Sequence, residues 1–266
     1  MVEFETEVID IIKRTSNVKS FRFKIKDKVD TSMASSPATS GQGLKVPLSI
    51  NLSESRRVDF KAGQYFFVTI KIDGAEGTKH FSFSNSPTEE GYVEFTKRIT
   101  ESQFSKALDK LKLGDWARLR MPYGSFIFES KYKKIAFLSG GIGITPIRSI
   151  CKFVMDKKLT ADIVLLYSNN REEDIIFRHD LDNMQSVNKN IRIVYTLTSF
   201  DIDKKIWQGR TGYIDDKMIK EEIQDYNART FYICGPPGMV ESLTNVLRNK
   251  LNIHKNQIKT ENFAGY

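Results

Sequence analysis

The sequence predicts two domains, an antiparallel β-barrel followed by an α/β domain built on a parallel sheet. The first half of the chain alternates apolar and polar residues in short stretches, which is typical of strands with one buried face. The second half alternates short apolar runs with helical segments, and 266 residues are enough for two domains. The pattern changes at the hydrophilic stretch ESKYKK, so we expect one domain over residues 1–130 and another over residues 131–266.

Short strands account for most of the first half. Turn-like stretches such as DGAEG and SPTEEG separate them, and one short helix is expected near Phe104–Leu111. Repeated short strands at this spacing favour an antiparallel barrel or sandwich. The expected strands are EFETEVIDIIKRT, VKSFRFKIK, QYFFVTIKID, KHFSFSN, YVEFTKRI and WARLRM.

Residues 28–57 depart from this pattern. They are rich in serine, carry two prolines and show little periodicity before VPLSINL. We interpret them as a loop insertion between two barrel strands, with room for one added strand, and we assign them no chemistry.

Strands and helices alternate along the second half, which indicates βαβ units around a parallel sheet. The expected strands are KKIAFLS, ADIVLLYS, IRIVYTL and TFYICG. Helices are expected near Pro146–Asp156, Asp174–Val187, Asp215–Gln224 and Gly238–Asn249.

Composition argues against several classes of protein. The two cysteines, Cys151 and Cys234, are too few for a disulfide framework, a four-thiolate zinc site or an iron–sulfur cluster. His80, His179 and His254 show no metal-ligand spacing, so no metal site is predicted. The net charge of +8 is spread along the chain, which favours a lysine-rich surface or an acidic protein partner over nucleic acid.

Neither a membrane span nor a signal peptide is expected from the sequence. No apolar run approaches the roughly 20 residues that span a bilayer. The start, MVEFETEVIDIIKRT, has acidic residues among its apolar ones and does not read as a signal peptide. A cytoplasmic protein is therefore expected.

The stretch FLSGGIGITPIRSI is predicted to be a strand, a glycine turn and a helix start. Gly140, Gly141 and Gly143 would let an anion approach the backbone, while Thr145 would cap the helix and Pro146 would open it. Such a turn aims backbone N–H groups and the positive end of the helix at a phosphate. The usual dinucleotide fingerprint has a third glycine where this chain has Pro146, so a plain strand-to-helix turn remains an alternative.

A second turn supports the phosphate interpretation. In YICGPPGMVESL a strand ends at Cys234, Gly235 and Pro236 begin a rigid turn, and Met239 opens a helix. In a parallel sheet both turns lie at the carboxyl ends of strands, where ligands bind in open α/β folds. Taken by itself, Cys234 is also explained as a small buried apolar residue, and CGPPGM is also explained as a turn without a ligand. The pair of turns is more specific than either member.

Three features together resemble the ferredoxin–NADP reductase family of flavin-dependent reductases. They are the stretches GGIGITP and CGPPGM and a preceding barrel that contains KHFSFSNSP. Further matches follow in order: KAGQY, FTKRITESQFSKAL, MPYGSF and the ending TENFAGY. The resemblance covers nearly the whole chain except residues 28–57. It implies a barrel that binds FAD and an α/β domain that binds a nicotinamide nucleotide.

The family's flavin motif, Arg-x-Tyr-Ser, corresponds here to Lys79, His80, Phe81 and Ser82. The resemblance implies that the Phe81 ring packs on the isoalloxazine and that the Ser82 hydroxyl lies near flavin N5. Lys79 supplies a point charge where an arginine would grip the pyrophosphate bidentately. The alternation of residues is equally well explained by a plain strand whose Phe81 and Phe83 face inward.

A second flavin contact is implied by FTKRITESQFS. The turn from Ser102 through Phe104 to Ser105 would offer backbone N–H groups and the Ser105 hydroxyl to the flavin phosphates. This turn leads us to expect FAD rather than FMN. Thr96, Lys97 and Arg98 lie on the preceding strand, where a cation would offset the loss of arginine at position 79; a solvated strand edge is the alternative.

The carboxyl end resembles the family's Glu-x-aromatic ending. Glu261 and Cys234 would lie beside the reacting nicotinamide carbon, with Ser82 near flavin N5, as the groups that shape hydride transfer. Phe263 or Tyr266 would cover the flavin ring, although Tyr266 is also explained as a frayed end.

YSNNREED follows the second strand of the α/β domain, where the adenosine ribose is usually read. Ser168 and Arg171 favour NADPH, because arginine pairs with a 2′-phosphate. Three acids that follow Arg171 argue the other way, so NADH remains possible.

The predicted function is a flavoprotein reductase that transfers hydride from NAD(P)H to FAD and passes electrons to an acidic carrier such as ferredoxin or flavodoxin. One alternative is the reductase component of an oxygenase or another multi-component enzyme. Another is a flavin-free nucleotide-binding regulatory protein of the same fold. The cofactors supply the reactivity and the protein supplies orientation.

Overall fold

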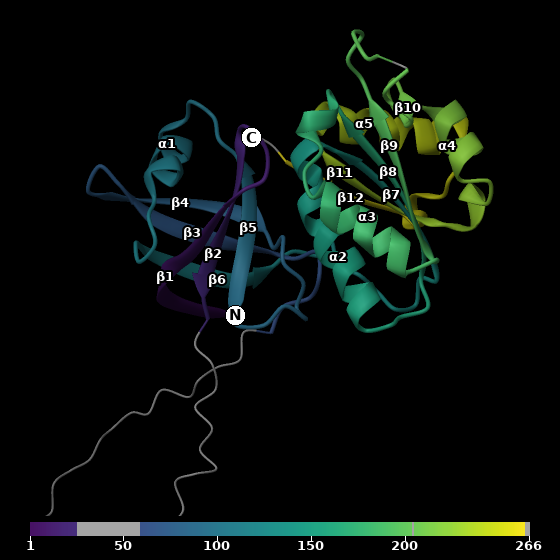
Figure 1. Cartoon of the computed structure of the whole chain (residues 1–266). Coiled ribbons are helices and arrows are strands. Elements are labelled where there is room, and N and C mark those ends of the chain that lie inside the picture. Colours follow the sequence, from purple (N-terminus) through teal and green to yellow (C-terminus); the bar gives the residue numbers. More distant parts are fainter. Residues whose placement is uncertain (26–58, 204, 264–266) are drawn as a thin grey trace, which may run out of the picture.

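The chain forms two domains that lie side by side in the computed structural model (Figure 1), which describes residues 1–25, 59–203 and 205–263. The first domain carries a six-stranded antiparallel sheet, and the second carries a six-stranded parallel sheet with helices on both faces. The predicted fold class is confirmed.

The first sheet curls into a half-barrel whose two edge strands meet. Its strand order is β4-β3-β6-β1-β2-β5, so β4 and β5 are the edges. Phe81 of β4 stacks on Phe95 of β5 with ring centroids 4.2 Å apart, which closes the seam. The elements are β1 (Val2–Lys13), β2 (Val18–Lys24), β3 (Tyr65–Ile72), β4 (Ala75–Ser82), β5 (Tyr92–Arg98), α1 (Gln103–Lys110) and β6 (Trp116–Tyr123).

Alternate residues of these strands fill the barrel, as the period-2 pattern predicts. Phe66, Val68 and Ile70 of β3 point inward and are fully buried. Phe21 of β2 packs beside them and stacks on Phe95 at 5.2 Å between centroids. The barrel therefore has an apolar, strongly aromatic core of its own.

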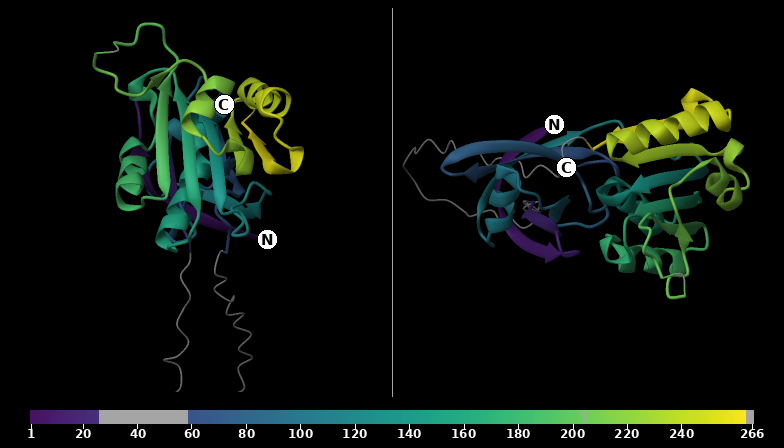
Figure 2. Two further views of the ribbon diagram at one scale, coloured as in Figure 1. Left: turned by 90° about the vertical axis from the view of Figure 1, so that its right-hand side faces the viewer. Right: turned by 90° about the horizontal axis from the view of Figure 1, so that it is seen from above.

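The second sheet has the order β10-β9-β8-β7-β11-β12 and runs between two helical layers. Helices α2 and α3 cover one face, and α4 and α5 cover the other, as the teal, green and yellow helices of Figure 2 show. The elements are β7 (Lys134–Gly140), α2 (Ile144–Asp156), β8 (Asp162–Asn169), α3 (Arg178–Val187), β9 (Ile191–Leu197), β10 (Arg210–Thr211), α4 (Asp216–Glu222), β11 (Thr230–Gly235), α5 (Pro237–Asn245) and β12 (Ile258–Asn262), with 3-10 turns at Gly141–Gly143, Glu172–Asp174, Tyr226–Ala228 and Lys255–Gln257 and a π-helical turn at Val246–Lys250.

Several element bounds differ from the prediction. The third predicted helix begins at Arg178 rather than Asp174, because Glu172–Asp174 form a 3-10 turn and Phe177 has the left-handed φ of 60°. The short strands β10 and β12 were not predicted. Strand β12, with the polar sequence IKTEN, forms the sheet edge beside β11, so no apolar alternation marks it.

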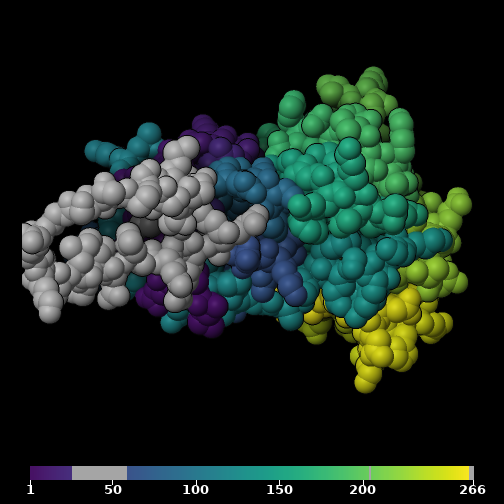
Figure 3. Space-filling view, turned by 90° about the horizontal axis from the view of Figure 1, so that it is seen from below, coloured from purple at the N-terminus to yellow at the C-terminus, as the bar shows by residue number. Residues whose placement is uncertain are grey.

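The two domains pack directly against each other. Seen from below, the blue atoms of the barrel lie against the teal atoms of the second domain (Figure 3). The expected insertion, residues 28–57, falls wholly outside the described residues. Among the described residues, no helix is both long and apolar enough to cross a bilayer.

Candidate functional site

The two glycine turns predicted to bind the nucleotide meet at the carboxyl edge of the parallel sheet. Strand β7 pairs with β11, and Ser139 lies opposite Cys234. A Cβ on Gly143 would overlap the Cys234 carbonyl oxygen and lie 2.8 Å from the Gly235 Cα. A Cβ on Gly140 would overlap the Met239 sulfur. The glycines therefore allow one turn to lie against the other.

The capping prediction at Thr145 and Pro146 is wrong in detail. Helix α2 begins at Ile144, directly after a 3-10 turn, and its N-cap is Gly143. The Thr145 hydroxyl donates to the Ile142 carbonyl at 3.1 Å instead of accepting from a helix N–H. Helix α5 likewise begins at Pro237, which puts Met239 in its first turn.

The candidate hydride-transfer residues of the second domain lie on neighbouring strands. Cys234 of β11 is opposite Glu261 of β12, and the N–H of Phe263, two residues after Glu261, donates to the Gly235 carbonyl at 3.1 Å. Burial, reinforced by the nearby Glu261 charge, raises the pKa of the Cys234 thiol well above its usual value. Burial also raises the pKa of Glu261. A neutral thiol fits a role in packing and polarity rather than covalent catalysis.

Two polar side chains at this edge lack hydrogen bonds. The Ser139 hydroxyl and both polar atoms of the Asn169 side chain are buried, with no partner among the described residues. Buried polar groups are normally paired, so orphaned ones at the carboxyl ends of β7 and β8 fit a polar ligand. Sequence reasoning missed both, although each is a polar residue at the end of an apolar strand.

Ser168 lines a cavity of about 320 Å³ beside the second glycine turn. Tyr213 and Ile214 form one side of this cavity, and Gly238 and Met239 of α5 form the other. The structure thus brings Ser168 and the GPPGM turn together. It keeps Arg171 engaged elsewhere, because its guanidinium pairs with Asp201 at 2.6 Å.

The candidate flavin cations lie on the edge strands that flank the barrel seam. Lys79 is exposed on β4, whereas the Lys97 side chain of β5 is 4 % exposed. Burial, together with the positive charge of Lys79, lowers the pKa of Lys97 to about 8. Two ammonium groups close enough to affect each other favour binding of a polyanion such as a diphosphate.

The structure differs from the resemblance at Phe81. Its ring is 2 % exposed and stacks on Phe95 inside the barrel, and Phe83 also faces inward. The segment therefore matches the alternative, a plain strand whose phenylalanines face inward. An isoalloxazine could contact Phe81 only if the Phe81 ring moved out of the barrel. His80 lies on the opposite face, near Tyr65 with ring centroids 5.2 Å apart. Ser82 is buried at the end of β4.

The hydroxyls of several residues at the expected flavin contact are hydrogen-bonded within the protein. Thr96 bonds with the hydroxyls of Ser20, at 2.7 Å, and Ser84, at 2.9 Å. Ser102 caps α1 by accepting from the Ser105 N–H at 3.3 Å. Ser105 is fully buried and its hydroxyl lies 3.0 Å from that of Thr100.

The other expected flavin contacts are placed as follows. Phe104 is buried against Phe81, 5.9 Å between ring centroids, and Arg98 donates to Asn17 at 3.3 Å. Phe263 is half-buried against the core of the second domain, and Tyr266 lies outside the described residues. Their roles toward a flavin remain predictions.

Comparison with known proteins identifies both domains. Residues 45–128 match the oxidoreductase FAD-binding domain and residues 137–245 match the oxidoreductase NAD-binding domain. The chain thus carries an oxidoreductase FAD-binding domain followed by an oxidoreductase NAD-binding domain. The first match begins at residue 45, inside the segment interpreted as an insertion.

Known relatives share the chain's sequence only in part. The glycine betaine monooxygenase reductase subunit of Chromohalobacter salexigens is 28% identical over 71% of this chain and 52% of its own length. NADH-cytochrome b5 reductase 1 of Eremothecium gossypii is 28% identical over 68% of this chain and 64% of its own. The chain thus spans about half to two thirds of these relatives.

A solved structure extends the likeness in fold. The cytochrome b5 reductase domain of Ulva prolifera nitrate reductase has a TM-score of 0.75 and 20% identity, covering 98% of this chain and 97% of that one. The whole described architecture is therefore shared with a reductase domain.

The residues present fit FAD and a nicotinamide nucleotide unequally. The glycine turns and the orphaned Ser139 hydroxyl fit a nucleotide at the sheet edge. The Lys79–Lys97 pair fits the diphosphate of FAD. Phe81, packed on Phe95, does not fit as a platform for the flavin ring in its present position.

Proposed function

We propose that the chain transfers hydride from a nicotinamide nucleotide to FAD and delivers the electrons to an acidic carrier protein. One observation carries this proposal. Arg148, on the helix that follows the nucleotide turn, donates a hydrogen bond to the carbonyl of Ser84, in the barrel segment that follows Ser82, at 3.1 Å. The segments expected to hold the two cofactors are thereby joined at the domain boundary.

Residues of this chain act by binding and orientation. Bound flavin and nicotinamide would supply the hydride chemistry itself. The glycine turns hold the nucleotide backbone, and Lys79 and Lys97 attract the flavin diphosphate. The Ser82 hydroxyl, the neutral Cys234 thiol and Glu261 line the place of transfer, where their polarity and shape favour one geometry.

The choice of acceptor rests on charge. The chain carries a net charge of +8, which attracts an acidic carrier such as ferredoxin or flavodoxin. A relative's name, glycine betaine monooxygenase reductase subunit, supports the related proposal that the acceptor is the partner component of an oxygenase.

Acceptor reduction is expected to slow as salt rises. With a ferredoxin, kcat/KM should fall about tenfold between roughly 20 and 200 mM salt, because screening weakens steered association. Reduction of an uncharged quinone serves as the control and separates steering from any effect of salt on flavin reduction. A ferredoxin rate that ignores salt would count against an acidic carrier.

For the nucleotide, we propose that the Arg171–Asp201 ion pair sets the preference, and that NADH is preferred while it is intact. The sequence favours NADPH through Ser168 and Arg171. In the structure Asp201 already neutralises Arg171, and Glu172 begins an acidic turn beside it. A 2′-phosphate placed there would compete with carboxylates for the guanidinium.

Asp201→Asn is expected to improve NADPH relative to NADH by about fivefold in kcat/KM, because it frees Arg171 for the phosphate. Stopped-flow reduction with each nucleotide measures this ratio, and the double variant Asp201→Asn, Arg171→Ala should lose the gain. An unchanged ratio in Asp201→Asn would place Arg171 away from the ribose.

A further inference from the structure

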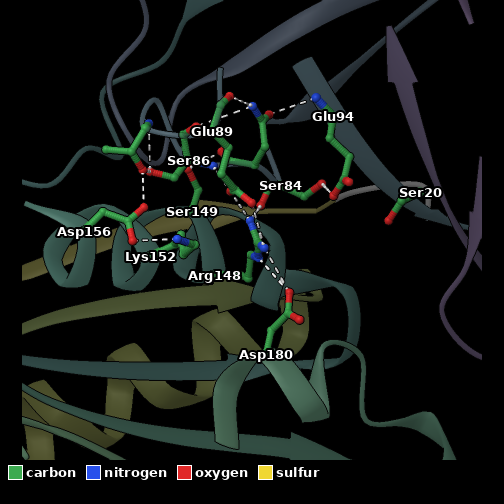
Figure 4. A network of polar contacts seen from close by, with 12 residues as sticks. Ser20, Ser84, Ser86, Glu89, Glu94, Arg148, Ser149, Lys152, Asp156 and Asp180 are labelled. Atoms are coloured by element: carbon green, nitrogen blue, oxygen red, sulfur yellow. Dashed lines mark hydrogen bonds and ion pairs between the residues drawn. The ribbon is translucent and has the colours of Figure 1, made fainter. Parts of the chain in front are cut away.

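Arg148 is a buried arginine at the boundary between the domains. It lies on the apolar helix α2, five residues after Gly143, and is 6 % exposed. Figure 4 shows its side chain between Ser84 and Glu89 of the barrel and Asp180 of α3. Sequence reasoning missed it, although an arginine within ITPIRSICKFV is an unusual residue for a buried helix.

Every N–H of the Arg148 guanidinium has an acceptor. An arginine side chain has five such donors. Nη1 donates to the Ser84 carbonyl at 3.1 Å and to Glu89 Oε2, and Nη2 donates to Glu89 Oε1 at 3.1 Å. Nε and Nη2 donate to Asp180 Oδ2 at 3.2 and 2.9 Å. One edge of the fork thus holds the barrel and the other holds the second domain.

The partners of Arg148 are themselves fixed. Glu89 also accepts from the Ser86 N–H at 2.7 Å and from the Tyr92 hydroxyl at 3.3 Å, so it cannot follow a moving guanidinium. The neighbouring Ser149 hydroxyl donates to the Asn85 carbonyl at 2.7 Å, which adds a second buried bond across the boundary. The loop 84–89 is therefore fastened to α2 at two consecutive residues.

Phe177 adds an aromatic contact to the same boundary. The Arg148 guanidinium lies 5.6 Å from the centre of its ring, and the guanidinium of Arg14, from the barrel, lies 4.8 Å away. Phe177 holds a left-handed φ of 60°, which a bulky residue rarely adopts. A backbone conformation of this kind persists where its surroundings fix it.

The ion pairs around Arg148 are better suited to fixing the relative position of the two domains than to stabilising the fold. Buried ion pairs lose much of their attraction to desolvation, so they often add little net stability. The planar fork of arginine fixes direction as well as charge, and lysine cannot reproduce it. The cluster is thus suited to holding two domains in one relative position.

We propose that Arg148 is a positioning residue that sets the distance between the hydride donor and the hydride acceptor. The Ser84 carbonyl lies two residues after Ser82, and Arg148 lies five residues after Gly143, so the fork joins the flavin segment to the nucleotide turn within a few residues of each. This inference rests on the proposed function, since it concerns where the two cofactors meet. Displacements of about 1 Å in such a pair cost on the order of a hundredfold in rate.

The test compares Arg148→Lys with Arg229→Lys. Arg229 is 5 % exposed and equally forked, but it binds Asp162 and Asp225 within the second domain, at the opposite edge of the sheet. It is therefore a matched control for loss of a buried guanidinium. Arg148→Lys should lower the rate of flavin reduction at saturating nucleotide by about tenfold or more, while the nucleotide dissociation constant changes less than about threefold. Arg229→Lys should keep the rate within about twofold, although both variants melt earlier.

Hydrogen exchange on the flavin-free protein tests the contact between the domains without depending on the rate of flavin reduction. Arg148→Lys should speed amide exchange in residues 84–92 and 144–152 by about tenfold, and Arg229→Lys should leave these segments unchanged. If Arg148→Lys does not fold, Glu89→Gln takes its place, because it removes the negative charge and one of the two carboxylate acceptors from the barrel side of the fork with little change of shape. Equal rate losses in the 148 and 229 variants, or unchanged exchange at the boundary, would overturn the proposal. A wild-type protein that binds flavin but is not reduced would instead overturn the proposed function.

Discussion

Gly143→Ala is expected to lower nucleotide-dependent flavin reduction by about a hundredfold. The added methyl would lie 2.6 Å from the Cys234 carbonyl carbon and 2.8 Å from the Gly235 Cα, so it would meet backbone rather than a flexible side chain. One glycine turn must then move away from the other, and the nucleotide would lose contacts with both. Overpacking of this kind also costs about 1–3 kcal/mol of stability. Stopped-flow reduction and thermal unfolding measure the two effects.

Gly238→Ala is the matched control for stability. Nothing lies within 4 Å of a Cβ at Gly238, which is in the first turn of α5. Alanine is a better helix former, so this variant should unfold at the same temperature as wild type or slightly higher. A Gly143→Ala protein that matches wild type in both stability and reduction would show that the two turns do not need to touch.

Lys97→Gln is expected to weaken FAD binding by about 10- to 100-fold at neutral pH, since a charge-assisted hydrogen bond to a phosphate is worth about 1.5–3 kcal/mol. Lys97 is the buried member of the cation pair at the barrel seam, where the low dielectric strengthens its attraction for an anion. Fluorescence titration of flavin-free protein with FAD measures the loss. Lys157→Gln, which removes an exposed lysine, is the control and should bind FAD as wild type does.

Because of Lys97, we expect FAD affinity and the folding stability of the flavin-free protein to change in opposite directions as pH rises. The pKa of Lys97 is about 8 in the folded protein, so the ammonium is present below that pH and is lost above it. FAD affinity should therefore fall by up to about tenfold per pH unit above 8. Stability of the flavin-free protein should rise between about 8 and 10.4, because the unfolded chain then binds more protons than the folded one. In Lys97→Gln both dependences should disappear; if they persist, another group is responsible.

Local patterns predict the two glycine turns that the structure brings together. Gly140 and Gly143 each follow an apolar strand and precede a helix, and parallel topology alone brings their turn beside the one at Gly235. The barrel follows from alternation, because each strand buries one face. Ser102 caps α1 and Phe81 packs on Phe95, and the roles of both residues toward a flavin stay predictions.

The rest depends on contacts between residues far apart in the chain. Arg148 meets Glu89 and Asp180 only after both domains have folded, and no periodicity marks the pairing. Strand β12 is polar, and it forms by backbone pairing with β11 rather than by burying an apolar face. The pairing of Arg171 with Asp201 likewise joins two loops, so sequence reasoning could weigh Arg171 only against its neighbours in the chain.

The central claim, a barrel that holds FAD beside a nicotinamide nucleotide, is tested most directly by anaerobic titration. Flavin-free protein is loaded with FAD, passed through a desalting column and mixed with NADH or NADPH in the absence of oxygen and of any acceptor. We expect the flavin to stay with the protein and its absorbance near 450 nm to bleach with about one equivalent of nucleotide, since one hydride carries both electrons. A colourless protein after desalting, or a yellow one that neither nucleotide bleaches, would contradict this account.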